Sequence, residues 1–143
     1  MNNYNDLSRG TFQTDYGKQL ISYEGLTFNG RSGHQNVTPT DIDGVVQLDN
    51  ENCFIFFELK YSGGVPDGQK TALTRLADAI QAGGKNCIVI VAVHGTAYPE
   101  KVIAKEATVT DFYLCGKWHK EKKQRKLYEF AQNYISYIKR KQA

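Results

Sequence analysis

The chain has 143 residues, which is the size of one domain with a substantial buried core. It shows no repeat of solenoid length, no basic-then-apolar signal peptide, and no apolar run longer than residues 87–93, which is far too short to cross a bilayer. We therefore expect one soluble, cytosolic domain over residues 1–143 and no membrane partner.

The net charge of +3 conceals an asymmetry along the chain. From Lys117 onward there are nine Lys or Arg and two Asp or Glu, so this part carries +7 and residues 1–116 carry −4. An acidic body suits carboxylates that hold a cation, and a basic tail suits a surface that binds phosphate. For any single lysine of the tail, a solvated helix face is the plainer explanation.

The first predicted elements are a helix over Thr11–Ser22 and a short strand over Leu26–Phe28. The dipeptide Asn29-Gly30 is typical of a tight turn. Strands are then predicted at Ile42–Leu48 and Cys53–Lys60, joined as an antiparallel hairpin by four polar residues. The second of these strands is apolar on both faces, which indicates a central position covered from both sides.

A helix is predicted from Asp67 to the Gly83-Gly84 stop, followed by a buried strand at Asn86–Val93. Its apolar stripe would consist of Ala72, Leu73, Leu76, Ala79 and Ile80. Because a strand, a helix and a strand follow one another, the two strands are expected to be parallel and joined by a right-handed crossover.

A strand at Val109–Cys115 and an amphipathic helix at Glu121–Lys139 complete the predicted fold. The apolar side of this helix packs either on the sheet or on a second subunit. If the protein is a homodimer, we expect the subunits to meet at Leu127, Phe130, Tyr134 and Ile138. The fold class is α/β with a mixed central sheet, in which residues 109–143 form a basic strand-helix extension.

The residues that bear on chemistry are Asp43, at the start of one hairpin strand, and Glu58 and Lys60, at the end of the next. In a strand, side chains two positions apart share a face, so Glu58 and Lys60 project together. Charges at the end of an apolar strand are costly unless they are compensated, and a divalent cation with oxygen ligands is one compensation. An exposed ion pair worth at most about 1 kcal/mol would account for neither the apolar neighbours nor Asp43.

These three residues resemble the signature of the PD-(D/E)XK nuclease superfamily. With the glycine-rich break at Ser62-Gly63-Gly64 and with Gln69 at the head of a helix, the chain is most similar to virus-type replication-repair (VRR) nuclease modules and to small phage Holliday-junction-resolvase-like nucleases. The resemblance covers residues 38–93. It implies a restriction-endonuclease-like core of helix, three strands, helix and strand.

The resemblance also implies roles. Asp43 and Glu58 would hold Mg²⁺ or Mn²⁺ with the carbonyl of Leu59, and Lys60 would orient or deprotonate the attacking water. Gln69 would face the site, or it is an ordinary residue of a helix start.

Two further carboxylates are candidate ligands. Asp41 shares a face with Asp43 and is either a second ligand or a cap for the preceding turn. Related nucleases commonly add an acidic residue from the first helix, and here Glu24 lies just after that helix. Whether one or two ions bind is open.

We therefore predict a metal-dependent DNA endonuclease that is selective for branched or flapped DNA, including Holliday junctions, in phage or mobile-element recombination and repair. A restriction-type enzyme is the nearest rival. A non-catalytic DNA-binding protein and a protein that interacts with a host enzyme are the alternatives outside catalysis. The residues expected to contact nucleic acid are Arg31, Lys70, Lys122, Lys123, Arg125 and Lys126.

Overall fold

The computed structural model describes residues 22–28, 37, 39, 41–62 and 67–142. The chain divides into two units, Met1–Pro39 and Thr40–Ala143, and each is described by itself. In the first unit, the backbones of Phe28 and Val37 exchange hydrogen bonds of 2.8 and 2.6 Å as an isolated antiparallel bridge. The predicted helix over Thr11–Ser22, apart from Ser22, and the Asn29-Gly30 turn lie outside the described residues.

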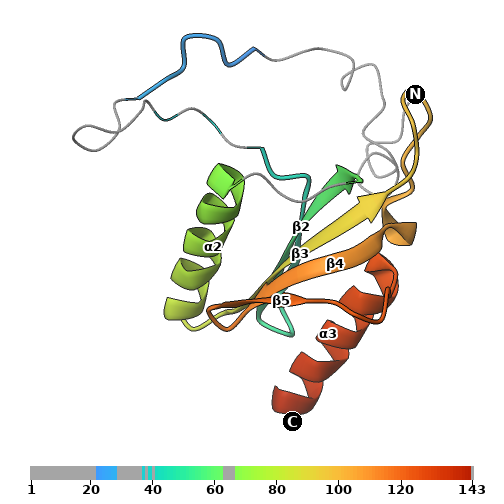
Figure 1. Cartoon of the computed structure of the whole chain (residues 1–143). Helices are drawn as coiled ribbons and strands as arrows, with labels where there is room; N and C mark the ends of the chain where they lie inside the picture. The colour runs from blue at the N-terminus through green and yellow to red at the C-terminus, as the bar shows by residue number, and fades with distance from the viewer. Residues whose placement is uncertain (1–21, 29–36, 38, 40, 63–66, 143) are drawn as a thin grey trace, which may run out of the picture. The chain divides into compact units, whose positions relative to one another are not determined.

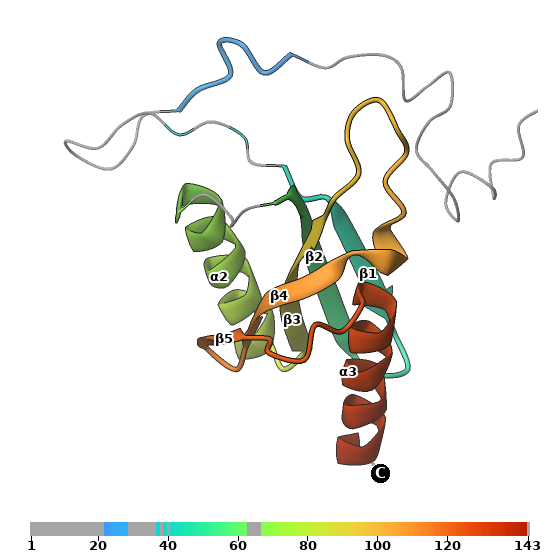
Figure 2. The ribbon, with the colours of Figure 1, turned by 45° about the vertical axis from the view of Figure 1, so that its right-hand side comes forward.

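The second unit is built on one five-stranded mixed sheet with the strand order β1-β2-β3-β4-β5 (Figure 1). Strands β2 and β3 run parallel, and the other neighbouring pairs run antiparallel. The two helices cover opposite faces of the sheet (Figure 2). The elements are β1 (Gly44–Leu48), β2 (Cys53–Tyr61), α2 (Asp67–Ala82), β3 (Asn86–His94), the 3₁₀ turn η1 (Ala104–Glu106), β4 (Thr108–Leu114), β5 (Lys117–Lys120) and α3 (Leu127–Gln142).

The predicted hairpin and crossover are both present. Strands β1 and β2 pair antiparallel, and the N–H of Asn52 closes their turn on the carbonyl of Asp49 at 3.1 Å. Asn52 has a φ of 54°, a left-handed conformation that asparagine tolerates well. Helix α2 then returns the chain so that β3 pairs parallel with β2. The α/β class with a mixed sheet is confirmed.

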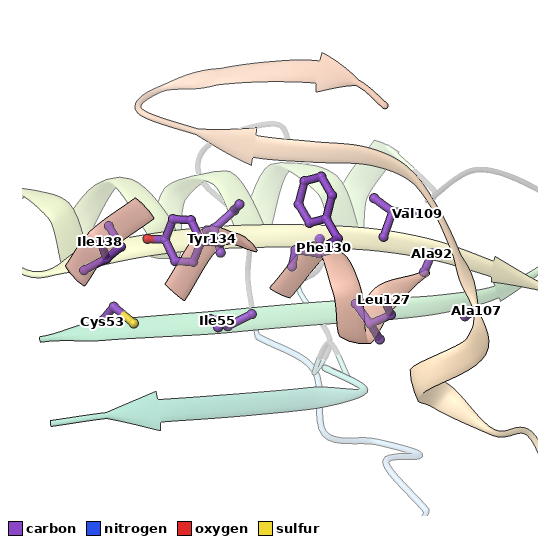
Figure 3. Packing of buried hydrophobic residues seen from close by; sticks show 11 residues of the cluster. Cys53, Ile55, Ala92, Ala107, Val109, Leu127, Phe130, Tyr134 and Ile138 are labelled. Carbon is purple, nitrogen blue, oxygen red and sulfur yellow. The ribbon is translucent and has the colours of Figure 1, made fainter. Parts of the chain in front are cut away.

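Strand β2 has apolar contacts on both faces of the sheet, as predicted for a central strand. Cys53 and Ile55 belong to a buried cluster with β3, β4 and α3, which Figure 3 shows at close range. Phe56 points to the other face, where it packs with Leu73 and Ala77 of α2. Even-numbered residues of β2 therefore face α2, and odd-numbered residues face α3.

Helix α2 has the predicted extent, and part of its predicted apolar stripe faces the sheet. Leu73 is 1% exposed and Ile80 packs against the same cluster, as predicted, and Ala77, also 1% exposed, joins them. The prediction is wrong for Leu76, which is 38% exposed, and for Ala72 and Ala79, which are also exposed. Leu73, Ala77 and Ile80 have the spacing of one helix face, and the apolar residues beside that face stay in solvent.

The C-terminal helix begins later than predicted, and the short strand β5 precedes it. Between them the backbone bonds to the β4 side of the sheet: the N–H of Glu121 donates to Thr110 and the N–H of Leu127 donates to Ala107, both at 2.8 Å. Gln124 has a φ of 54°, which a right-handed helix does not accommodate. Residues 121–126 are thus an extended connection rather than a first helical turn.

The apolar side of α3 packs on the sheet. Leu127, Phe130, Tyr134 and Ile138 are 2–6% exposed and belong to the cluster that contains Ile55. The prediction that subunits meet at these four residues is wrong, because the sheet already buries them. A homodimer as such stays a prediction, as does one domain over residues 1–143.

Position 44 should tolerate only glycine, because an aromatic ring on the neighbouring strand occupies the space of a Cβ atom. Its pairing partner is Phe57, and a Cβ at position 44 would overlap the end of the Phe57 ring. We predict that Gly44→Ala lowers the free energy of unfolding by about 1–3 kcal/mol through overpacking. The same change in a Phe57→Leu background should cost less, and urea denaturation of the four proteins measures this coupling. Additive costs would show that Phe57 does not exclude a side chain at position 44.

Candidate active site

Two carboxylates close the open end of the β1–β2 hairpin. The strand register ends with Gly44 opposite Phe57, and its continuation by one residue sets Asp43 opposite Glu58. The N–H of Asp43 donates to Oε1 of Glu58 at 3.2 Å, and the N–H of Leu59 donates to Oδ2 of Asp43 at 2.7 Å. Each carboxylate therefore accepts a hydrogen bond from the strand that carries the other.

Glu58 is 1% exposed and is the one buried charged side chain among the described residues. Burial, followed by the negative charge of Asp43, raises the pKa of Glu58 to about 7. A hydrogen bond between the two carboxyl groups acts in the same direction, whereas the N–H of Asp43 and the charge of Lys60 lower the pKa. Near neutral pH the pair thus takes up or releases a proton easily, and an added cation would favour its charged form.

Lys60 lies on the same face of β2 as Glu58, two residues further along the strand. This is the α2 face, because Phe54 and Phe56 on the same side belong to the α2 cluster. Lys60 is half-buried, and its charge acts on the Glu58 carboxyl group. The end of β2 therefore presents a carboxylate and an ammonium group together, as the strand period predicts.

The other carboxylates predicted as ligands are Asp41 and Glu24. Asp41 is exposed two residues before Asp43. Glu24 belongs to the unit of residues 1–39, so its role as a ligand stays a prediction. In the described part of the chain, no three His, Cys, Asp or Glu side chains gather closely enough to hold a metal ion. The carboxylates that the structure brings together are Asp43 and Glu58.

Two further predicted site residues are placed by their backbones. Leu59 donates its N–H to Asp43, so its main chain lies against the carboxylate pair. Gln69 lies in the first turn of α2, with a side chain outside the described part of the structure. Its predicted role stays a prediction.

A third carboxylate, Asp111, lies on the same sheet face, and no local pattern of the sequence indicates it. Glu58 pairs with Val91, Val91 pairs with Asp111, and Asp111 pairs with Lys120, so these four residues form one row across β2, β3, β4 and β5. Oδ1 of Asp111 lies 2.9 Å from Nζ of Lys120. Asp111 is thus paired with Lys120, and it forms no metal-binding cluster with Asp43 and Glu58 among the described residues. Only the register of three strand pairs reveals this row.

The basic residues predicted to bind nucleic acid have different surroundings. Nζ of Lys70 lies 4.4 Å from the ring centre of Trp118. Lys122 and Lys123 are exposed between β5 and α3. Arg125 is half-buried, pairs with Glu121 and lies over the ring of Phe130. Lys126 is exposed, with Nζ 3.4 Å from the Thr108 hydroxyl, and Arg31 lies outside the described residues.

Two cavities lie on the α3 side of the sheet. One, of about 200 Å³, is lined by residues of β3, β4 and α3 and by Arg125. The other, of about 270 Å³, is lined mainly by β1, β2 and α3. Neither is lined by Asp43, Glu58 or Lys60. The carboxylate pair thus lies at a strand end outside these two cavities.

Comparison with protein-family models, with curated proteins and with solved structures finds no match for this chain. Among the described residues, no helix is long and apolar enough to cross a membrane. The functional interpretation consequently depends on the geometry of the site.

The raised pKa of Glu58 predicts a specific dependence of stability on pH. The folded protein holds this proton up to about pH 7, whereas the ordinary value of 4.5 applies to the unfolded chain. Between these values the folded state binds more protons, so the contribution of Glu58 to stability falls as pH rises to 7. Glu58→Gln should therefore be more stable than the wild type by about 1–3 kcal/mol at pH 8 and nearly equal to it at pH 4.

Urea denaturation in EDTA at pH 4, 6 and 8 measures this difference. Glu129→Gln, which changes an exposed glutamate of α3, is the control and should leave the pH profile unchanged. Superimposable curves for wild type and Glu58→Gln at all three pH values would contradict the prediction.

Proposed function

We propose that this chain is a metal-dependent nuclease of the PD-(D/E)XK type that hydrolyses DNA phosphodiesters. The observation that carries this proposal is the buried carboxylate of Glu58, held against Asp43 with Lys60 on the same face of β2. Burial of one carboxylate beside another is unfavourable for the ionised pair. A divalent cation would offset both the burial and the repulsion.

The donor set fits Mg²⁺ or Mn²⁺. Asp43 and Glu58 would hold the ion, with the main-chain carbonyl of Leu59 as a further oxygen ligand. Mg²⁺ is usually held by one or two carboxylates and leaves its other positions to water and substrate phosphate. A bound ion would supply positive charge at the phosphate and make a coordinated water more acidic.

Lys60 has a role that the carboxylates cannot fill. Its ammonium group lies on the face of Glu58, where it would orient the attacking water and stabilise the negative charge that develops on the phosphate oxygens. The charge of Lys60 also acts on the Glu58 carboxyl group, whose pKa it lowers. Lys60 therefore complements the ion rather than replacing it.

We further propose that the substrate is branched or flapped DNA, in phage or mobile-element recombination or repair. Asp43 and Tyr61 are exposed at this strand end, which favours a polymer that passes over it. The rival functions keep the fold without turnover: a DNA-binding protein, or a protein that interacts with a host enzyme.

Cleavage assays with site variants test the proposal. Asp43→Asn, Glu58→Gln and Lys60→Ala should each lower the rate of Mg²⁺-dependent cleavage of a flapped or four-way DNA by at least about 100-fold, because each removes a separate role. Asp111→Asn is the matched control, since it changes a carboxylate on the same sheet face at a distance from the pair. It should cleave at nearly the wild-type rate.

The choice of metal ion separates the rival functions. Ca²⁺ should support DNA binding by the wild type with little cleavage, and Mg²⁺ or Mn²⁺ should support both. Binding without cleavage in all three ions would favour the non-catalytic DNA-binding protein. Full cleavage activity in Glu58→Gln would overturn the proposed site.

The basic connection before α3 should contribute to phosphate binding. Each neutralised phosphate releases counterions, with a salt slope of about 0.9 per contact on duplex DNA. Lys122→Ala/Lys123→Ala should therefore flatten the dependence of the logarithm of affinity on the logarithm of salt by up to about two units. Lys101→Ala/Lys105→Ala removes the same charge from two other exposed lysines and should leave the slope unchanged. Equal slopes in both double variants would place phosphate binding elsewhere.

A further inference from the structure

Two rings lie opposite each other where the parallel strands β2 and β3 end. Tyr61 and His94 are the last pair of the β2–β3 register, and their ring centres are 5.6 Å apart at an angle of 53°. Tyr61 is 60% exposed. The strand ends that carry them lie at the same end of the sheet in Figure 2. A large aromatic surface is therefore open to solvent beside the last strand residues.

A backbone hydrogen bond, rather than packing in the core, orients the ring of His94. The N–H of Thr96 donates to Nδ1 of His94 at 3.2 Å, which assigns the proton of the neutral ring to Nε2. Neither Tyr61 nor His94 belongs to a buried apolar cluster of the described residues. Core packing consequently does not account for this oriented ring pair.

The ring pair is adjacent to the candidate active site along the chain. Tyr61 directly follows Lys60, and neighbouring Cα atoms lie 3.8 Å apart. Because side chains alternate along a strand, Tyr61 points to the face opposite Lys60 and Glu58. Lys60 and Tyr61 are the last two residues of β2, so a nucleotide whose phosphate lies at Lys60 can place its base past the strand end, on the side of the Tyr61 ring.

We propose that the Tyr61–His94 ring pair stacks on an unpaired base next to the phosphate held at Glu58 and Lys60. This inference rests on the proposed nuclease function and names its substrate class: DNA with a single-stranded flap or an unpaired nucleotide at the cleavage point. Aromatic rings stack on any base whose face is free, and a base inside a continuous duplex does not offer that face. The stack thus selects structure without reading sequence.

Fluorescence of 2-aminopurine tests the stack independently of cleavage. The base analogue is placed at successive unpaired positions of a flapped DNA, and the full-length protein is added with Ca²⁺. The wild type should quench one or two of these positions, Tyr61→Phe should retain the quenching and Tyr61→Leu should lose it. Stacking contributes about 1–3 kcal/mol per base, so Tyr61→Leu should weaken flap binding by about 5- to 150-fold and leave binding to continuous duplex unchanged.

Tyr137→Leu is the matched control. Tyr137 is 43% exposed on α3, and this variant should quench and bind as the wild type does. Wild-type quenching by Tyr61→Leu, or an equal loss of affinity for flap and duplex, would overturn the stacking proposal. Quenching without Mg²⁺-dependent cleavage would support the stack and overturn the nuclease function. Cleavage without quenching would support the nuclease function and overturn the stack. Absence of both overturns both.

Discussion

The reciprocal hydrogen bonds of Asp43 and Glu58 are the constraint on which the candidate site depends. They satisfy two backbone N–H groups just past the point where the pairing of β1 with β2 ends, at Gly44 and Phe57. Because side-chain oxygens accept these bonds in place of carbonyls, a carboxylate, that of Glu58, lies at a position almost closed to water. The raised pKa of Glu58 is the direct consequence.

The paired residues Gly44 and Phe57, next to the two carboxylates, allow the strands to come close together here. Gly44 carries no side chain, and the ring of Phe57 occupies the space that a Cβ would need. Because side chains alternate along each strand, the ring lies on the α3 face and the carboxylates lie on the α2 face. The dipeptides Asp43-Gly44 and Phe57-Glu58 thus act as one unit, with an apolar contact on one face and the charged pair on the other.

The rest of the sheet keeps this unit in place. Residues 87–92 of β3 are at most 1% exposed, so the strand beside β2 is covered on both faces. Glu58 pairs with Val91 inside this buried stretch, and Lys60 and Tyr61 lie beyond it at the strand end. In open α/β sheets, ligands commonly bind outside the carboxyl ends of parallel strands, and β2 and β3 are the parallel pair here. The buried apolar part of β2 and β3 therefore positions the polar groups at the carboxyl ends of these strands.

Much of this arrangement follows from local patterns in the sequence. The hairpin, the α2 crossover and the common face of Glu58 and Lys60 depend on turn residues and on the strand period, which are local properties. The row from Glu58 to Asp111 depends on the register of distant strands, and which apolar residues of α2 face the sheet depends on how the helix packs there. Strand β5 was missed because its four residues, Lys-Trp-His-Lys, read as part of a basic tail. Pairing with β4 makes them a strand.

The charge of the carboxylate pair is not needed for the hydrogen bonds that it accepts. An amide oxygen of Asn or Gln could accept the bonds from Leu59 and Asp43 in the same positions. Such amides would avoid both the burial of a charge and the repulsion between two carboxyl groups. The fold would therefore be at least as stable with neutral side chains, and in the function we propose the carboxylates would add affinity for a cation. A site that costs stability in the empty protein and gains it with an ion is typical of function rather than of structural support.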